Sequence, residues 1–234
     1  MKQYDVLFID LDDTLYDFSS NSRDAYEEVY ALLEYDRYFD SFQHYYTIYW
    51  EYNSRLWVRY AAGEITRDYL NAERYTYPLR VVGAPDADAL GARFWHESMQ
   101  RLPLGKRLMP HAREVLDYLR PRYRKIYILS NGFTELQARK MQSAGIGHYF
   151  DGMVLSEDIG VNKPHPDIFL HALRMASTTA DKALMVGDNF DVDILGARGV
   201  GIDQVYYNPE GKPVPPEAQP THVIASLLEL KEIL

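Results

Sequence analysis

Four stretches of this chain place polar side chains where an apolar run ends or in the loop beyond it. The candidate residues are Asp10, Asp12, Ser130, Lys163 and Asp188. Carboxylates together with a hydroxyl and an ammonium group can bind a divalent cation and an anion at one place. Such a set is typical of metal-assisted chemistry on a phosphorylated compound.

Asp10 and Asp12 follow the apolar run Val6-Leu7-Phe8-Ile9. Two residues apart in extended backbone, both side chains point the same way. Two close carboxylates resist simultaneous ionisation unless a cation lies between them, and Mg²⁺ is the natural candidate. Asp188, which ends another apolar run at 183–187, can supply a further ligand.

Ser130 ends an apolar run and is followed by Asn131 and Gly132. The hydroxyl and the following backbone amides form a suitable anion site, because a glycine lets the backbone approach closely and a helix beginning near residue 134 directs its positive end there. Lys163, in a loop stiffened by flanking prolines, can neutralise a phosphate or hold Asp10 ionised.

Short buried strands alternate with helices over most of the chain. Strands are expected at 4–9, 124–130, 152–155, 183–187, 202–206 and 222–224. Helices are expected at 86–101, 110–120, 135–144, 166–175, 190–198 and 226–233. Pro110 is expected at the first helical position of its helix, and Thr134 and Gln137 are expected to form a capping box.

This alternation predicts an α/β fold, a Rossmann-like doubly wound parallel sheet. A tyrosine-rich, helix-periodic segment interrupts it after the first strand. We therefore expect a core domain from residues 1–17 and 104–234, and an inserted all-helical domain at 18–103. In an open parallel sheet ligands bind beyond the carboxyl ends of the strands, which is where the candidate residues lie.

Composition excludes several other classes. A net charge of −9 disfavours a polynucleotide or an anionic membrane as a partner. The chain has no cysteine, which excludes disulfides, zinc thiolate sites and a cysteine nucleophile. No apolar run approaches the roughly 20 residues of a transmembrane helix, and no signal peptide is evident, so a cytoplasmic location is expected.

Taken together, four ordered motifs resemble those of the haloacid dehalogenase-like (HAD) hydrolase superfamily. They are Asp10-Leu11-Asp12-Asp13-Thr14, Ser130, Lys163-Pro164, and Gly187-Asp188 with Asp193. The match covers essentially the whole expected core. The resemblance implies a Rossmann-like core whose helical insert is a cap domain.

The resemblance also implies roles for single residues. Asp10 resembles the nucleophile that forms an aspartyl-phosphate intermediate and binds magnesium. Asp12 resembles the general acid/base, with its main-chain carbonyl on the metal. Ser130 and Lys163 would hold the phosphoryl group, and Asp188 would complete the metal site. Asp193 is expected to support that site, although the spacing after Gly187 also offers Asp191.

Three other functions are alternatives to a phosphatase: a dehalogenase, a phosphomutase and a response-regulator receiver. Dehalogenation releases a halide that needs no proton, so it requires neither Asp12 nor magnesium. A phosphomutase would use the same aspartates while excluding water. A response-regulator receiver also has an acidic cluster and a lysine, but receivers are about half this length and lack a helical insert.

Further stretches resemble the pyrimidine 5′-nucleotidase branch of the superfamily. They are Leu56-Trp57-Val58, Gly63-Glu64-Ile65-Thr66, Ser130-Asn131-Gly132-Phe133 with Leu136-Gln137, Ser156-Glu157-Asp158-Ile159-Gly160-Val161 before Asn162-Lys163-Pro164, and Asp193-Ile194-Leu195-Gly196. This implies a nucleoside 5′-monophosphatase acting on a small pyrimidine nucleotide. The alternative is a phosphatase of sugar phosphates or other small phosphometabolites.

Overall fold

The computed structural model describes residues 2–234, which form two compact units. The α/β unit comprises the chain up to Phe18 together with Lys106–Leu234, and the helical unit is Ser19–Gly105. None of the described helices combines the length and the apolar character that a membrane crossing needs.

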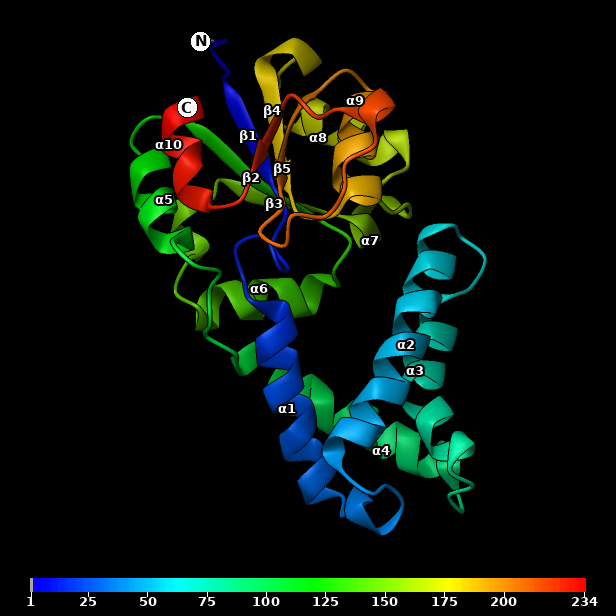
Figure 1. The fold of residues 1–234 in the computed structure, drawn as a ribbon. Coiled ribbons are helices and arrows are strands. Elements are labelled where there is room, and N and C mark those ends of the chain that lie inside the picture. Colours follow the sequence, from blue (N-terminus) through cyan, green and yellow to red (C-terminus); the bar gives the residue numbers. More distant parts are fainter. Residues whose placement is uncertain (1) are drawn as a thin grey trace. The chain divides into compact units, whose positions relative to one another are not determined.

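A six-stranded sheet forms the centre of the α/β unit, in the order β3-β2-β1-β4-β5-β6 (Figure 1). Its strands are β1 (Val6–Ile9), β2 (Lys125–Ser130), β3 (Gly152–Leu155), β4 (Ala183–Gly187), β5 (Asp203–Tyr207) and β6 (His222–Ile224). Every neighbouring pair is parallel. The strand order reverses between β1 and β4, as in a doubly wound fold, so the predicted fold class is confirmed.

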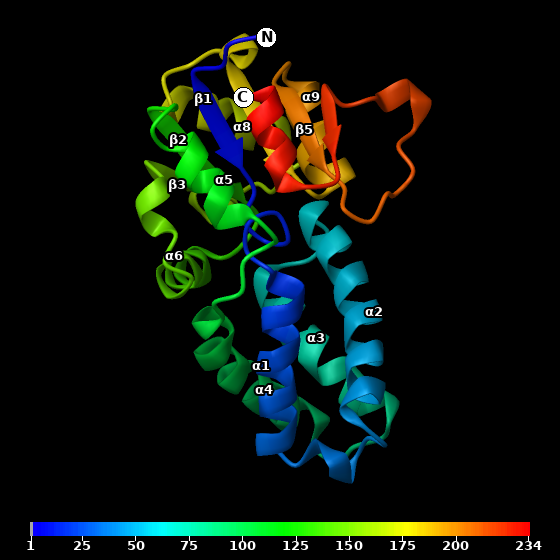
Figure 2. The ribbon, with the colours of Figure 1, turned by 60° about the vertical axis from the view of Figure 1, so that its left-hand side comes forward.

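Helices cover both faces of this sheet (Figures 1 and 2). The helices of the α/β unit after the first strand are α5 (Ala112–Leu119), α6 (Thr134–Ser143), α7 (Ser156–Ile159), α8 (Pro166–Met175), α9 (Leu195–Gly199) and α10 (Leu230–Ile233). Side chains alternate along a strand, so β1 contributes to two hydrophobic clusters, one on each face of the sheet. Leu7 and Ile9 pack with residues of α5 and α10, whereas Val6 and Phe8 pack with residues of α8. Burial on both faces explains why β1 is a continuous apolar run.

Several local predictions differ from the structure, most by one or two residues at an element's end, and three differ in kind. The helix expected from Pro110 begins at Ala112, because His111 has a φ of 65° that a right-handed helix cannot contain. The helix expected at 190–198 is a π-helical turn, Phe190–Ile194, followed by α9. The prediction of a capping box at the start of α6 is wrong. The N-cap residue of α6 is Phe133, whose side chain makes no hydrogen bond to the helix start.

The helical unit contains four α-helices, which Figure 2 shows. They are α1 (Phe18–Leu32), α2 (Phe42–Ala61), α3 (Arg67–Val81) and α4 (Ala87–Arg101). Ser41 caps α2 and Thr66 caps α3, each accepting a backbone N–H three residues on, which satisfies one of the free donors at a helix start. Aromatic side chains fill the interior, with Tyr26, Tyr75 and Phe94 among the fully buried residues.

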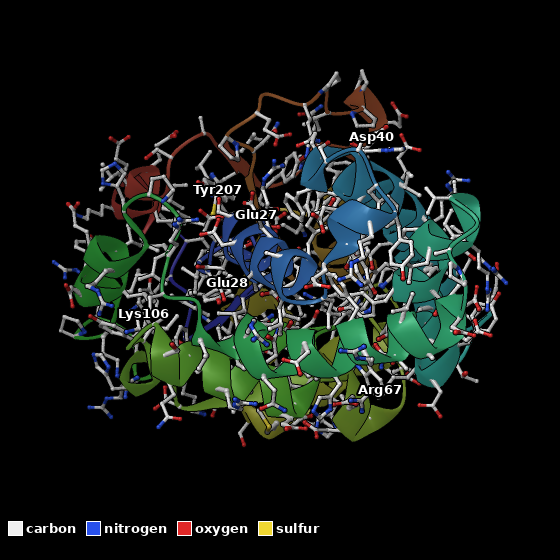
Figure 3. The ribbon with its side chains drawn as sticks, turned by 90° about the horizontal axis from the view of Figure 1, so that it is seen from below. Glu27, Glu28, Asp40, Arg67, Lys106 and Tyr207 are labelled. Atoms are coloured by element: carbon white, nitrogen blue, oxygen red, sulfur yellow. The ribbon has the colours of Figure 1, made fainter. Side chains whose placement is uncertain are left out.

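The exposure pattern of α1 shows how the sequence directs this packing. Tyr26, Val29 and Tyr30 are buried, whereas Glu27 and Glu28 are exposed on the same helix (Figure 3). Apolar residues three and four apart form one face of a helix. Tyr26 and Tyr30 of α1 therefore belong to the interior of the helical unit.

Candidate active site

Asp10 and Asp188 come together because their strands are neighbours. β1 and β4 pair with Ile9 opposite Val186, and the Asp10 N–H donates to the Val186 carbonyl at 2.9 Å. Each aspartate is the first residue after its strand. Both side chains thus lie at the carboxyl edge of the sheet, where the strand order reverses.

Lys163 is the centre of the charge network at this edge. Its Nζ donates to Asp10 Oδ1 at 2.6 Å, to Asp193 Oδ1 at 2.6 Å and to the Leu129 carbonyl at 2.7 Å. These three bonds use every donor of an ammonium group. Burial alone would lower the pKa of Lys163, but the attraction of Asp10 and Asp193 raises it above its ordinary value. Lys163 is therefore a buried cation that two carboxylates hold in place.

Asp10, Asp188 and Asp193 form a compact carboxylate cluster. One oxygen from each lies within 4.8 Å of the others. Burial raises the pKa of Asp10 well above its usual range, and Lys163 only partly offsets this. Burial and the repulsion of Asp193 raise the pKa of Asp188 to about 7. Three carboxylates thus share one ammonium group, and this excess negative charge suits a divalent cation with oxygen ligands.

Asp193, and not Asp191, is the acid that the fold brings to this cluster. Asp193 is buried, and its second oxygen accepts the Asn189 N–H at 3.1 Å, whereas Asp191 is exposed. Gly187 makes room for it, because a Cβ at that position would lie 2.4 Å from Asp193 Oδ2. Sequence spacing alone did not show whether Asp191 or Asp193 supports the site. The π-helical turn directs Asp193 inward and leaves Asp191 exposed.

The Ser130 hydroxyl accepts two hydrogen bonds and keeps its own hydrogen. The Gly132 N–H donates to its Oγ at 3.0 Å and the Gln137 side-chain amide donates at 2.7 Å. A hydroxyl has two acceptor positions and one donor, so its hydrogen remains available to an anion. A Cβ at Gly132 would lie 2.1 Å from Gln137 Nε2, so a larger residue at this position would displace the Gln137 amide.

The Asn131 side chain holds the loop that carries Lys163, whereas the anion contact expected from the sequence is one of the Asn131 backbone amide. Its Nδ2 donates to the Lys163 carbonyl at 2.9 Å, and its Oδ1 accepts the Lys163 N–H at 2.7 Å. Both ends of the amide are therefore used to hold the loop that carries Lys163. A contact of Asn131 with an anion would use its backbone N–H or the second hydrogen of Nδ2.

Asp12 lies apart from the carboxylate cluster and is held by α6. Lys140 Nζ donates to its two oxygens at 2.8 and 3.1 Å, and Gln137 Nε2 donates to Oδ2 at 2.9 Å. The Asp12 side chain does not join the three-acid cluster among the described residues. The Asp12 carboxylate is thus held by α6 and not by the residues that could bind a metal ion.

Sequence reasoning missed three residues of this site. Thr14 donates to Asp188 Oδ1 at 2.8 Å, and Gln137 and Lys140 bind Asp12. The available signal was the spacing of Gln137 and Lys140, which puts two polar residues on one face of α6. The capping-box interpretation assigned Gln137 to the helix end instead.

Comparisons with known proteins show the family to which this chain belongs. Residues 4–201 match the sequence pattern of the haloacid dehalogenase-like hydrolases. The HAD-hydrolase YfnB of Bacillus subtilis (strain 168) is 30% identical over 100% of this chain and 97% of its own length. A magnesium-bound structure of YfnB has a TM-score of 0.84 at 29% identity, covering 100% of this chain and 99% of that one.

Several relatives have names that state a substrate, and two of them match along almost the whole chain. The pyrimidine 5′-nucleotidase YjjG of Escherichia coli (strain K12) is 32% identical over 99% of this chain and 98% of its own length. The ribulose-1,5-bisphosphate 5-phosphatase of Halopiger xanaduensis is 31% identical over 98% of each chain. With its sheet order, its ordered motifs and these matches, the chain belongs to the haloacid dehalogenase-like hydrolase family.

Proposed function

We propose that this protein is a magnesium-dependent phosphomonoester hydrolase that acts through an aspartyl-phosphate on Asp10. The observation that carries the proposal is the Lys163 network. A buried ammonium group holds Asp10 at the edge of the sheet, 2.6 Å from its Oδ1, beside two further carboxylates. A carboxylate can approach an anionic phosphorus only where cations offset the repulsion between them.

Asp10, Asp188 and the main-chain carbonyl of Asp12 would hold the magnesium ion, with Asp193 supporting them. The fit rests on the excess of three carboxylates over one ammonium group and on the raised pKa values of Asp10 and Asp188. When bound, the ion supplies positive charge that stabilises the transferring phosphoryl group.

The first step forms a bond between an Asp10 carboxylate oxygen and phosphorus, and breaks the bond to the leaving oxygen. Lys163 and the Ser130 hydroxyl offset the charge on the phosphoryl group. Asp12, when protonated, gives its proton to the leaving alkoxide. The alcohol departs and an acyl phosphate remains on Asp10.

In the second step a water oxygen attacks phosphorus, and the bond to Asp10 breaks. Asp12, now a carboxylate, takes a proton from that water. Inorganic phosphate leaves, Asp10 regains its carboxylate, and Asp12 carries the proton for the next turnover. One residue thus serves as acid and then as base.

The substrate we propose is a pyrimidine nucleoside 5′-monophosphate. Support comes from the resemblance of the stretches around Trp57, Ser130 and Ser156 to that branch, and from the likeness to YjjG along the whole chain. The second candidate is a sugar phosphate, which the similar identity to a ribulose-1,5-bisphosphate 5-phosphatase supports. In either case the partner is a small phosphorylated metabolite, neither a polynucleotide nor a membrane, and a cytoplasmic location stays a prediction.

Phosphate release from a panel of monophosphates, with magnesium and with EDTA, tests this proposal. The panel contains dUMP, dTMP, UMP, AMP, glucose 6-phosphate and ribulose 1,5-bisphosphate. We expect magnesium-dependent release that is strongest for the pyrimidine nucleotides. A preference for the sugar phosphates would contradict the proposed nucleotide substrate but not the proposed mechanism. Phosphate release that EDTA does not reduce would contradict the magnesium requirement.

A further inference from the structure

Helix α6 provides three hydrogen bonds to the Asp12 carboxylate. Lys140 Nζ contacts both oxygens, at 2.8 and 3.1 Å, and Gln137 Nε2 contacts Oδ2 at 2.9 Å. Three N–H donors directed at one carboxyl group fix both its position and its orientation. The four motifs of the family do not include either residue of α6.

The burial of Lys140 shows that this contact is specific. Its side chain is only 4% exposed, whereas that of Asp12 is 26% exposed. Its Nζ also lies 4.3 Å from the centre of the Phe18 ring. Burying an ammonium group is costly unless it is paired, and Asp12 is the carboxylate to which Lys140 donates in the described residues.

Gln137 connects Asp12 to Ser130. Its Nε2 donates to Asp12 Oδ2 at 2.9 Å and to Ser130 Oγ at 2.7 Å. Because Gln137 and Lys140 are three residues apart, they lie on the same face of α6. This face therefore holds two groups of the candidate active site that come from different strand ends.

We propose that Lys140, assisted by Gln137, is a positioning residue that aims the Asp12 carboxylate at the water that hydrolyses the aspartyl-phosphate. The inference rests on the proposed function. In this step the water oxygen bonds to phosphorus, a water proton passes to Asp12, and the electron pair of the broken P–O bond returns to Asp10. A misdirected Asp12 slows this step and leaves the phosphoryl group on Asp10.

Hydrolysis of p-nitrophenyl phosphate isolates this step, because nitrophenolate leaves without needing a proton. The value of kcat/KM reports the steps up to formation of the acyl phosphate, whereas kcat also contains its hydrolysis. For Lys140→Met we expect kcat to fall by about tenfold or more, as part of the roughly 10²–10⁴-fold effect of acid–base catalysis. We expect KM to fall in parallel and kcat/KM to stay within about twofold of the wild type.

Rapid mixing gives an independent readout. Lys140→Met should release a burst of nitrophenolate close to one per active site, and acid quenching should trap phosphorylated protein. The matched control is Arg139→Met, which removes a cation from the adjacent position of α6, where no bond to Asp12 is made. Lys140→Gln keeps an N–H donor and provides a second variant should the methionine protein fail to fold.

The outcomes separate this inference from the proposed function. A wild-type protein without magnesium-dependent release, or an Asp10→Asn protein with full activity, would contradict the proposed function itself. With an active wild type, unchanged kinetics in both Lys140 variants would overturn the positioning role. An equal loss in kcat and kcat/KM, without a burst, would also overturn it, because it would show only a general structural effect.

Discussion

In the α/β unit the buried ionisable groups Asp10, Lys163 and Asp193 meet at one edge of the sheet, whereas the helical unit buries tyrosine hydroxyls, together with the Arg74 side chain, within an aromatic interior. In the first unit Lys163 joins Asp10 and Asp193. In the second, Tyr49 donates to the Tyr26 hydroxyl at 3.0 Å, which contacts the Tyr75 hydroxyl at 3.2 Å.

This difference separates polar groups used for chemistry from polar groups that accompany packing. A tyrosine buries a large ring and needs only one partner for its hydroxyl, so it stabilises an interior at small cost. A cluster of like charges opposes folding and persists where a ligand or a reaction uses it. Substitutions in the charged cluster should therefore have larger effects than substitutions of buried tyrosine hydroxyls.

Replacing Asp10 by asparagine should abolish turnover and leave the fold intact. Activity should fall by about 10⁴-fold or more, as expected for a lost nucleophile. Because burial disfavours the charged form of Asp10, the neutral amide should not lower the melting temperature at pH 7. Phosphate release and a thermal melt on the same preparation measure both effects, and an unfolded variant would contradict this interpretation of the charge cluster.

Replacing Lys163 by methionine should cost both activity and stability. The change leaves buried carboxylates without their cation, which typically costs about 3–5 kcal/mol in the free energy of unfolding. Urea denaturation of the metal-free protein measures the loss. The exposed Lys182 provides the control, and Lys182→Met should stay within about 0.5 kcal/mol of the wild type. Equal stabilities of the two variants would show that the Lys163 network adds nothing to folding.

Stability of the metal-free protein should fall as pH rises through about 7. The folded-state pKa values of Asp10 and Asp188 are raised, the latter to about 7, so the folded protein binds more protons than the unfolded chain above about pH 4. Their contribution is present in full below the unfolded pKa and is lost as pH passes the folded pKa.

Magnesium should reverse this loss, because it stabilises the ionised carboxylates. The rise in melting temperature on adding magnesium should therefore be larger at pH 8 than at pH 5.5. Melting curves with EDTA and with magnesium at both pH values measure it. An equal shift at the two pH values would show that the acidic cluster is not the metal site.

Hydroxyl deletions in the helical unit should have the smallest effects. Tyr26→Phe breaks contacts with two neighbouring hydroxyls and should cost about 1–3 kcal/mol. Tyr45→Phe removes a buried hydroxyl that has no partner in the described residues, so it should be neutral or stabilising. Urea denaturation of this matched pair measures both, and a larger loss for Tyr45→Phe would contradict the assignment of hydrogen bonds.

The sheet was predictable because its central strands are short apolar runs that end at polar residues. β3, β4 and β6 have the expected bounds, and β1 and β2 differ only at their starts. Asp10 and Asp188 could be placed together because strands of a parallel sheet end at a common edge. These inferences use only the hydrophobic periodicity of the sequence and the order of the predicted strands and helices.

The contacts of Gln137, Lys140 and Asn131 were not predictable in the same way. Each depends on which way a side chain turns after tertiary packing, and the local sequence does not determine that direction. Gln137 also fitted a capping box, whose geometry the structure does not contain. The choice between Asp191 and Asp193 likewise depended on the π-helical turn.

The central claim, a covalent phosphoryl group on Asp10, can be tested directly. Protein mixed with magnesium and dUMP is quenched in acid within milliseconds and digested, and the peptides are examined by mass spectrometry. We expect one phosphoryl group on the peptide that contains Asp10, absent from Asp10→Asn and enriched in Lys140→Met. Rapid phosphate release without a phosphorylated peptide in either active protein, or a phosphoryl group on another residue, would contradict it.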